Sequence, residues 1–183
     1  VNLMGAPGAG KTTLLERTIQ ALKPYLKIGV IEGDIVGQDD ADRIGALEVP
    51  VVQINTGGAC HLDANMISEV LDDLPLRELD LLIIENVGNL VCPAEFKVGE
   101  NMKMMVLSIA EGHDKPLKYP LMFRESSALV LSKMDLLPYM NTDMNKVRSD
   151  SLALNPKLNI FEVSCTSGAG IDAWATWLSG FRS

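Results

Sequence analysis

The sequence is poor in cysteine, histidine and aromatic residues, and it lacks any long apolar run. Its 183 residues include three cysteines and two histidines, and 5% are aromatic. No apolar stretch approaches the roughly 18 residues that a membrane-spanning helix needs, which excludes an integral membrane protein. Three cysteines cannot all pair within one chain, so in a reducing compartment they indicate free thiols or metal ligands. We expect a soluble, cytoplasmic protein with no secretory signal and no membrane partner.

Basic charge is also in short supply. Sixteen lysines and arginines stand against twenty-four aspartates and glutamates, which gives a net charge of −8. A nucleic-acid surface requires a basic patch or stripe, so we expect no nucleic-acid partner. At 47% hydrophobic residues, the chain has enough apolar material for one substantial core. The composition therefore predicts a single domain over residues 1–183.

The most informative segment present is Gly5–Thr12, which matches the phosphate-loop pattern G-x-x-x-x-G-K-[ST] at every fixed position. It lies between an apolar stretch and a helical pattern, the context that distinguishes a true phosphate loop from a chance glycine-rich turn. Lys11 is expected to act catalytically on the β and γ phosphates, and Thr12 to bind Mg²⁺ through its hydroxyl. The expected nucleotide contacts here are Gly5, Ala6, Pro7, Gly8, Ala9, Gly10, Lys11, Thr12 and Thr13.

Short apolar runs alternate with amphipathic segments along the rest of the chain, which is typical of an α/β fold. We predict strands over residues 1–4, 28–32, 51–55, 81–86, 105–110, 128–132 and 160–164. We predict helices after the phosphate loop and over residues 40–47, 63–74, 119–125, 142–155 and 171–180. This order predicts a P-loop NTPase with a mostly parallel, doubly wound sheet of about seven strands and helices on both faces.

Acidic residues follow two of the predicted strands, at the sheet edge where open parallel sheets bind ligands. Asp34 and Glu85 are expected to hold Mg²⁺ directly or through water, and Gly88 to donate its N–H to a γ-phosphate. Asp40 is the candidate for orienting the attacking water. The alternatives are a solvated or helix-capping role for the neighbouring aspartates, and for Glu85 a structural ion pair with Lys11.

Residues 132–135 predict base recognition. Asp135 can accept two hydrogen bonds, from N1 and from the exocyclic amine of guanine, a donor pair that adenine does not offer. The tetrapeptide resembles the N-K-x-D element of GTPases, with Ser132 in place of asparagine and so without an amide that would brace the site. Ser164, Cys165 and Thr166 lie where GTPases place a backbone N–H beside the guanine oxygen. Ser132, Lys133 and Asp135 complete the expected nucleotide contacts.

Cys60 and His61 are adjacent at a predicted strand-to-helix turn, and Cys92 lies seven residues beyond Glu85. Thiolate and imidazole suit a soft or borderline metal such as Ni²⁺ or Zn²⁺. Each of these metals normally takes four protein or solvent ligands, so a set of two or three predicts completion by a symmetric dimer. Taken without regard to family, such cysteines are more often structural or simply buried.

Over essentially its whole length the chain resembles the HypB family of hydrogenase nickel-incorporation GTPases. The motifs that carry the resemblance are the phosphate loop and residues 32–34, 58–64, 84–94 and 114–120. The resemblance implies Mg²⁺-dependent GTP hydrolysis coupled to nickel delivery into the large subunit of [NiFe] hydrogenase, with HypA as partner. It also implies a nucleotide- and metal-dependent homodimer around a Ni²⁺ or Zn²⁺ site formed by Cys60, His61 and Cys92.

Two other functions fit parts of the pattern. A urease-type nickel chaperone GTPase also carries cysteine and histidine near this position, with a different intervening pattern. A nucleotide-sensing dimerisation module would need no metal transfer. The favoured hypothesis is that Mg·GTP orders the loops from Asp34 and Glu85, and that the second loop moves Cys92 relative to Cys60 and His61.

Overall fold

A computed structural model describes residues 1–181, and within them the chain forms one seven-stranded sheet. The sheet order is β3-β2-β4-β1-β5-β6-β7, and all paired strands run parallel. The strands are β1 (Asn2–Gly5), β2 (Ile28–Asp34), β3 (Val51–Asn55), β4 (Leu81–Glu85), β5 (Lys103–Ser108), β6 (Ser126–Ser132) and β7 (Asn159–Glu162). The predicted α/β P-loop architecture is confirmed, and the sheet is wholly rather than mostly parallel.

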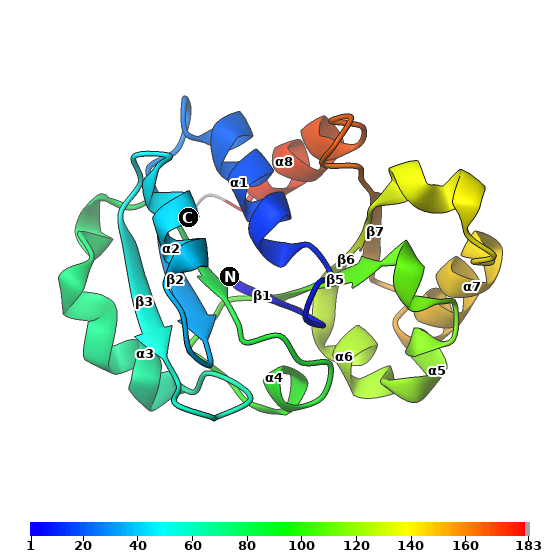
Figure 1. Cartoon of the computed structure of the whole chain (residues 1–183), viewed down its shortest axis with the longest axis horizontal. Coiled ribbons are helices and arrows are strands. Elements are labelled where there is room, and N and C mark those ends of the chain that lie inside the picture. The colour runs from blue at the N-terminus through cyan, green and yellow to red at the C-terminus, as the bar shows by residue number, and fades with distance from the viewer. Residues whose placement is uncertain (182–183) are drawn as a thin grey trace.

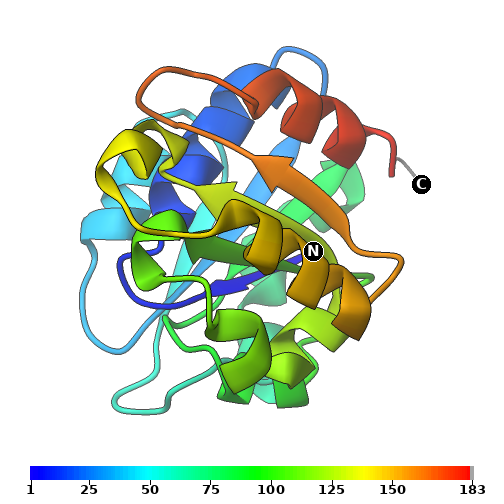
Figure 2. The ribbon, with the colours of Figure 1, turned by 90° about the vertical axis from the view of Figure 1, so that its right-hand side faces the viewer.

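Helices cover both faces of the sheet, as predicted (Figures 1 and 2). They are α1 (Lys11–Leu22), α2 (Asp39–Gly45), α3 (Ala64–Val70), α4 (Cys92–Glu95), α5 (Lys115–Lys118), α6 (Pro120–Glu125), α7 (Met144–Leu154) and α8 (Ile171–Ser179). In Figure 1, α1 and α8 lie along the upper side of the sheet, and α4 and α6 lie along the lower side. None of the helices in residues 1–181 has the length and apolar character needed to cross a membrane.

The core is divided by the alternation of side chains along the strands. Leu3 of β1 joins the cluster under α1, α2 and α8, whereas its neighbour Met4 joins the cluster under α4, α6 and α7. A third cluster packs α3 against Ile31 and Ile84 on the edge half of the sheet. Because β1 is buried throughout and lies at the centre, the loop that follows it is held at the middle of the sheet edge.

The expected helix-forming face of α1 is confirmed, since Leu14, Leu15, Thr18, Ile19 and Leu22 are all buried. The helix predicted over residues 63–74 ends earlier, at Val70, and continues as a 3₁₀ turn over Leu71–Asp73. Leu74 is extended because Pro75 follows it, and a residue before proline disfavours the helical region.

Several other boundaries also differ from the prediction. The strand predicted over residues 105–110 runs instead over Lys103–Ser108, and Ser108 then caps a 3₁₀ turn. Lys103 can be buried in this strand because its Nζ donates a hydrogen bond to the Ala94 carbonyl at 2.6 Å. Cys92 was expected in a loop and instead opens α4, where Pro93 is tolerated because the first helical turn needs no backbone donor. The short helix α5 was not predicted.

Trp174 provides a test of how α8 is fixed to α1. Its side chain is 1% exposed and its Nε1 donates to Thr18 Oγ1 at 2.9 Å. We expect Trp174→Ala to lower the free energy of unfolding by about 3–5 kcal/mol, because a large buried side chain is lost. Urea denaturation followed by circular dichroism measures it, with the half-buried Trp177→Ala as the matched control. A loss at Trp174 no larger than that of the control would contradict this packing.

Candidate functional site

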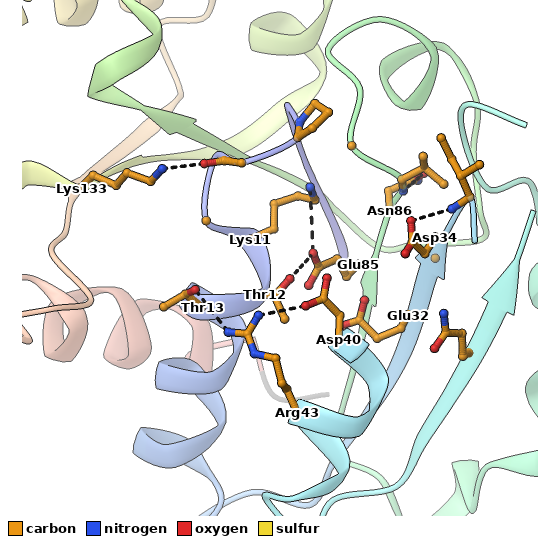
Figure 3. Close-up of a pocket in the computed structure, with 18 residues that line it drawn as sticks. Lys11, Thr12, Thr13, Glu32, Asp34, Asp40, Arg43, Glu85, Asn86 and Lys133 are labelled. Carbon is orange, nitrogen blue, oxygen red and sulfur yellow. Dashed lines mark hydrogen bonds and ion pairs between the residues drawn. The ribbon is translucent and has the colours of Figure 1, made fainter. Parts of the chain in front are cut away.

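The phosphate loop joins β1 to α1 and borders a cavity of about 490 Å³ at the carboxyl ends of the strands (Figure 3). Gly10 caps α1 with φ at +92°, in the left-handed region that glycine adopts without strain. The N-terminus of α1 therefore points its free N–H groups at the cavity. The expected loop residues that line the cavity are Pro7, Gly8, Gly10, Lys11, Thr12 and Thr13.

Lys11 and Thr12 both contact Glu85, which lies at the end of β4. Thr12 Oγ1 donates to Glu85 Oε1 at 3.0 Å, and Lys11 Nζ lies 4.0 Å from the same oxygen and 3.4 Å from the Ala6 carbonyl. Glu85 is 4% exposed. The structural ion pair considered as an alternative is thus present, and it places the Glu85 carboxylate beside the hydroxyl expected to bind a cation.

Glu32, in β2, is a buried carboxyl group that the sequence prediction did not select. It is 3% exposed, it lines the cavity, and β2 pairs with β4 so that Glu32 is in register with Glu85. Burial, together with the charge of Glu85, raises the pKa of Glu32 to about 10, and burial also raises the pKa of Glu85. Near pH 7, Glu32 therefore carries a proton. A charged residue inside an apolar strand run was the signal available in the sequence.

Oxygen donors for a cation gather on this side of the cavity. Within residues 1–181, Glu32 Oε1 and Glu85 Oε2 are buried and have no hydrogen-bond partner. Asp34 ends β2 and lines the cavity, although its Oδ1 accepts from the Ile35 N–H at 2.7 Å. Carboxylate and hydroxyl oxygens are the donors that Mg²⁺ prefers. Thr12, Asp34 and Glu85, the three residues expected to hold Mg²⁺, thus all line the same cavity.

Asp40 lies in the first turn of α2 and also lines the cavity. Its Oδ1 accepts from Arg43 Nη1 at 2.9 Å, and Arg43 Nη2 in turn lies 2.8 Å from Glu16 Oε2. Arg43 therefore links α2 to α1 across the mouth of the cavity, close to Thr13 (Figure 3). The sequence prediction did not select Arg43, whose only signal was its place at helical spacing after Asp40.

Among the residues expected to read the base, Lys133 lines the cavity and the others do not. Ser164 Oγ donates to Asp135 Oδ1 at 2.6 Å, which fixes the Asp135 carboxylate. Cys165 is half-buried and Thr166 is exposed, both directly after Ser164. The hydrogen bond brings Asp135 and Ser164 together, and Cys165 and Thr166 follow Ser164 in the chain.

Ser132 lacks the asparagine amide, as the sequence shows, but its hydroxyl makes a contact of its own. Its buried hydroxyl donates to the Ala9 carbonyl at 2.6 Å, and Lys133 Nζ donates to the Gly8 carbonyl at 2.7 Å. A hydroxyl can donate as an amide does, so serine still ties β6 to the phosphate loop. Gly88 is likewise held there: a Cβ at Gly88 would come within 2.9 Å of the Pro7 nitrogen.

Cys60, His61 and Cys92 form a compact cluster outside the cavity. Their ligand atoms all lie within 4.8 Å of one another, and the two sulfurs are 3.0 Å apart. Cys60 is exposed and the other two are half-exposed, so none of them is a buried core residue. The imidazole of His61 stacks on Phe96, with ring centroids 4.0 Å apart. Hydrogen bonding with Cys60 raises the pKa of the Cys92 thiol. The cluster supplies soft ligands at an open position.

Comparison with known proteins shows the family to which the chain belongs. Residues 1–162 match the sequence profile described as CobW/HypB/UreG, nucleotide-binding domain. The hydrogenase maturation factor HypB of Escherichia coli K12 is 51% identical over 182 residues, which is 100% of this chain and 63% of that protein. The crystal structure of the same factor from Archaeoglobus fulgidus is 40% identical, with a TM-score of 0.90 over 98% of this chain and 87% of that one. The chain belongs to the HypB branch of the CobW/HypB/UreG family.

The structure of HypB from Helicobacter pylori in complex with nickel is 39% identical, with a TM-score of 0.91, and covers 100% of this chain and 88% of that one. The resemblance predicted from the motifs is thereby confirmed. The chain spans about three-fifths of the length of the Escherichia coli HypB. The activity and partners of the whole protein are therefore proposed below. The role of each site residue also stays a prediction.

The neutral state of Glu32 predicts a pH dependence for the nucleotide-free, Mg²⁺-free protein. Between the ordinary carboxyl pKa of 4.5 and the folded value of about 10, the native state holds a proton that the unfolded chain has lost. Stability therefore falls as pH rises, by at most about 1.4 kcal/mol per pH unit for one group. We expect Glu32→Gln to flatten this slope and to be the more stable form at pH 8.

Urea unfolding between pH 6 and pH 9 in a chelating buffer measures the slope. Glu69→Gln, at an exposed position on α3, is the matched control and should keep the wild-type slope. If Glu32→Gln kept that slope as well, the assignment of a buried proton to Glu32 would be wrong.

Proposed function

We propose that this chain is the GTPase domain of a nickel metallochaperone, which couples GTP hydrolysis to nickel delivery into the large subunit of [NiFe] hydrogenase. The observation that carries the proposal is the position of the metal-ligating cluster. Cys92 lies on the same short segment, residues 85–92, whose other end is the cavity carboxylate Glu85. A movement of Glu85 when the phosphates change would therefore be passed along this short segment of chain to Cys92, one of the three soft ligands.

In the nucleotide site, Lys11 neutralises the β and γ phosphates while the backbone N–H groups of the phosphate loop hold them. Thr12, Asp34 and Glu85 would hold a magnesium ion, which would neutralise charge developing on the phosphate oxygens. Asp40 orients the attacking water once Arg43 releases it, and Gly88 lends its N–H to the γ-phosphate. Asp135 accepts from the guanine N1–H and amino group, with Ser164 fixing the carboxylate.

The metal-ligating cluster carries the cargo rather than a resident cofactor. Two thiols and one imidazole suit Ni²⁺ or Zn²⁺, and both usually take four donors. An open three-ligand site on the surface is suited to sharing with a second copy of the chain, so we propose a homodimer that depends on metal and nucleotide. HypA is the proposed partner for transfer, directly or onward to the hydrogenase. We place this action in the cytoplasm, where thiols stay reduced.

Two substitutions separate the two halves of the proposal. Lys11→Ala should abolish GTP hydrolysis, because the phosphates lose their principal cation. Cys60→Ala should reduce nickel affinity by more than roughly 100-fold, the upper end of what even an outer-shell loss costs, while hydrolysis without added nickel continues. Phosphate release and competition with a chromophoric chelator measure the two effects. Cys165→Ala is the matched thiol control, and nickel loss in that control would contradict the assigned ligands.

Base recognition has its own test in Asp135→Asn. An amide presents a donor where the carboxylate presented an acceptor, so guanine is rejected and xanthine, which carries an oxygen at that position, is accepted. We expect GTP affinity to fall by on the order of 100-fold and xanthosine triphosphate affinity to rise. Fluorescent-nucleotide competition measures both. Unchanged GTP affinity would show that another residue reads the base.

A further inference from the structure

Within the segment 85–92, Asn89 contacts both the phosphate loop and the metal-ligating cluster of Cys60, His61 and Cys92. Its backbone N–H donates to the Gly5 carbonyl at 3.0 Å, which forms an antiparallel bridge with the first glycine of the phosphate loop. Gly88, just before it, lies against Pro7 so closely that no Cβ would fit. The main chain of Asn89 is thus anchored to the nucleotide-binding loop.

The side chain of Asn89 contacts the metal-ligating cluster. Its Nδ2 donates to the Cys60 carbonyl at 3.3 Å, and its Oδ1 accepts from the Val91 N–H at 2.8 Å. It is also hydrogen-bonded to the Cys92 thiol. One half-buried amide therefore contacts the backbone of one thiol residue and the side chain of the other, although the two are 32 positions apart in sequence.

The neighbouring Asn86 makes a different kind of contact. It is 1% exposed, its Oδ1 accepts from the Leu62 N–H at 3.0 Å, and its Nδ2 donates to Asn2 Oδ1 at 3.1 Å. All its partners lie in the core, where a polar group must keep its hydrogen bonds. Asn86 fixes the bases of the two loops, and Asn89 joins the loops beside the thiols.

We propose that Asn89 is the positioning residue that transmits the state of the nucleotide to the metal-ligating thiols. This rests on the proposed function, since it requires both nucleotide and nickel. A displacement of the phosphate loop or of Gly88 on γ-phosphate binding shifts the Asn89 main chain, and its amide then moves Cys60 relative to Cys92. The distance between the two sulfurs sets how well they share one ion, so nickel affinity follows the nucleotide.

The test measures nickel affinity by chelator competition with GDP and with a non-hydrolysable GTP analogue, in wild type and in Asn89→Ala. A coupling of typical size gives a ratio of roughly five- to 150-fold between the two states in wild type. We expect the ratio to fall to about one in Asn89→Ala, because its side-chain contacts at both cysteines are gone. Linkage requires the nickel effect on analogue affinity to disappear by the same factor.

Asn89→Asp is the second variant, because it keeps the size and the acceptor for Val91 while removing the donor to Cys60. It should also lose the ratio. Asn159→Ala is the matched control: its Nδ2 donates to the Ser127 carbonyl at 3.1 Å, far along the chain from both sites, and its ratio should stay that of wild type.

Three outcomes would overturn the assignment. If both affinities fell by the same factor in Asn89→Ala, Asn89 would merely support the loop. If the ratio survived in both variants, another residue would carry the coupling while the proposed function stood. If wild type itself gave equal nickel affinities in the two states, there would be no coupling for Asn89 to transmit, and the nucleotide-driven part of the proposed function would fail with it.

Discussion

The parallel pairing of β1 with β4 is the constraint from which the rest of the site follows. Both strands end at the same edge, so the phosphate loop after β1 and the segment after β4 must leave the sheet side by side. Their contact is close enough to require Gly88 at Pro7 and to bridge Asn89 to Gly5. A nucleotide site and a thiol cluster that are remote in sequence thereby become neighbours in one continuous piece of chain.

The same edge concentrates buried charge that the nucleotide-free protein only partly neutralises. Glu32 and Glu85 lie in register on paired strands, and Lys11 Nζ lies 4.0 Å from Glu85 Oε1. Desolvation favours the protonated carboxyl groups, and a divalent cation would favour the ionised ones. Such a pair costs stability in the absence of ligand and is suited to releasing a proton when a cation binds. These buried carboxyl groups therefore serve cation binding at a cost in the stability of the ligand-free protein.

The strand and helix pattern of the fold could be predicted because it depends on local apolar periodicity, and the phosphate loop because its spacing is fixed by backbone geometry. The observed boundaries differ from the predicted ones where a polar residue has a buried hydrogen-bond partner, as Lys103 has in Ala94. They also differ where Pro93 lies in the first turn of α4. Glu32, Arg43, Asn89 and Phe96 were missed because their importance comes from contacts across the fold, which no sequence spacing displays. The hydrogen bond from Ser132 to the Ala9 carbonyl is a contact of the same kind.

The central claim is that residues 85–92 carry the nucleotide state to the thiols, and amide hydrogen exchange tests it most directly. Exchange is compared with Mg·GDP and with Mg²⁺ and a non-hydrolysable GTP analogue, both without nickel. The account predicts altered protection over residues 86–92 and also over residues 57–62. The change over residues 57–62 should be lost in Asn89→Ala, in which the Gly57 N–H still donates to the Ile35 carbonyl but the side-chain bond to the Cys60 carbonyl is absent. Altered protection confined to the phosphate loop and the base-reading residues would contradict it.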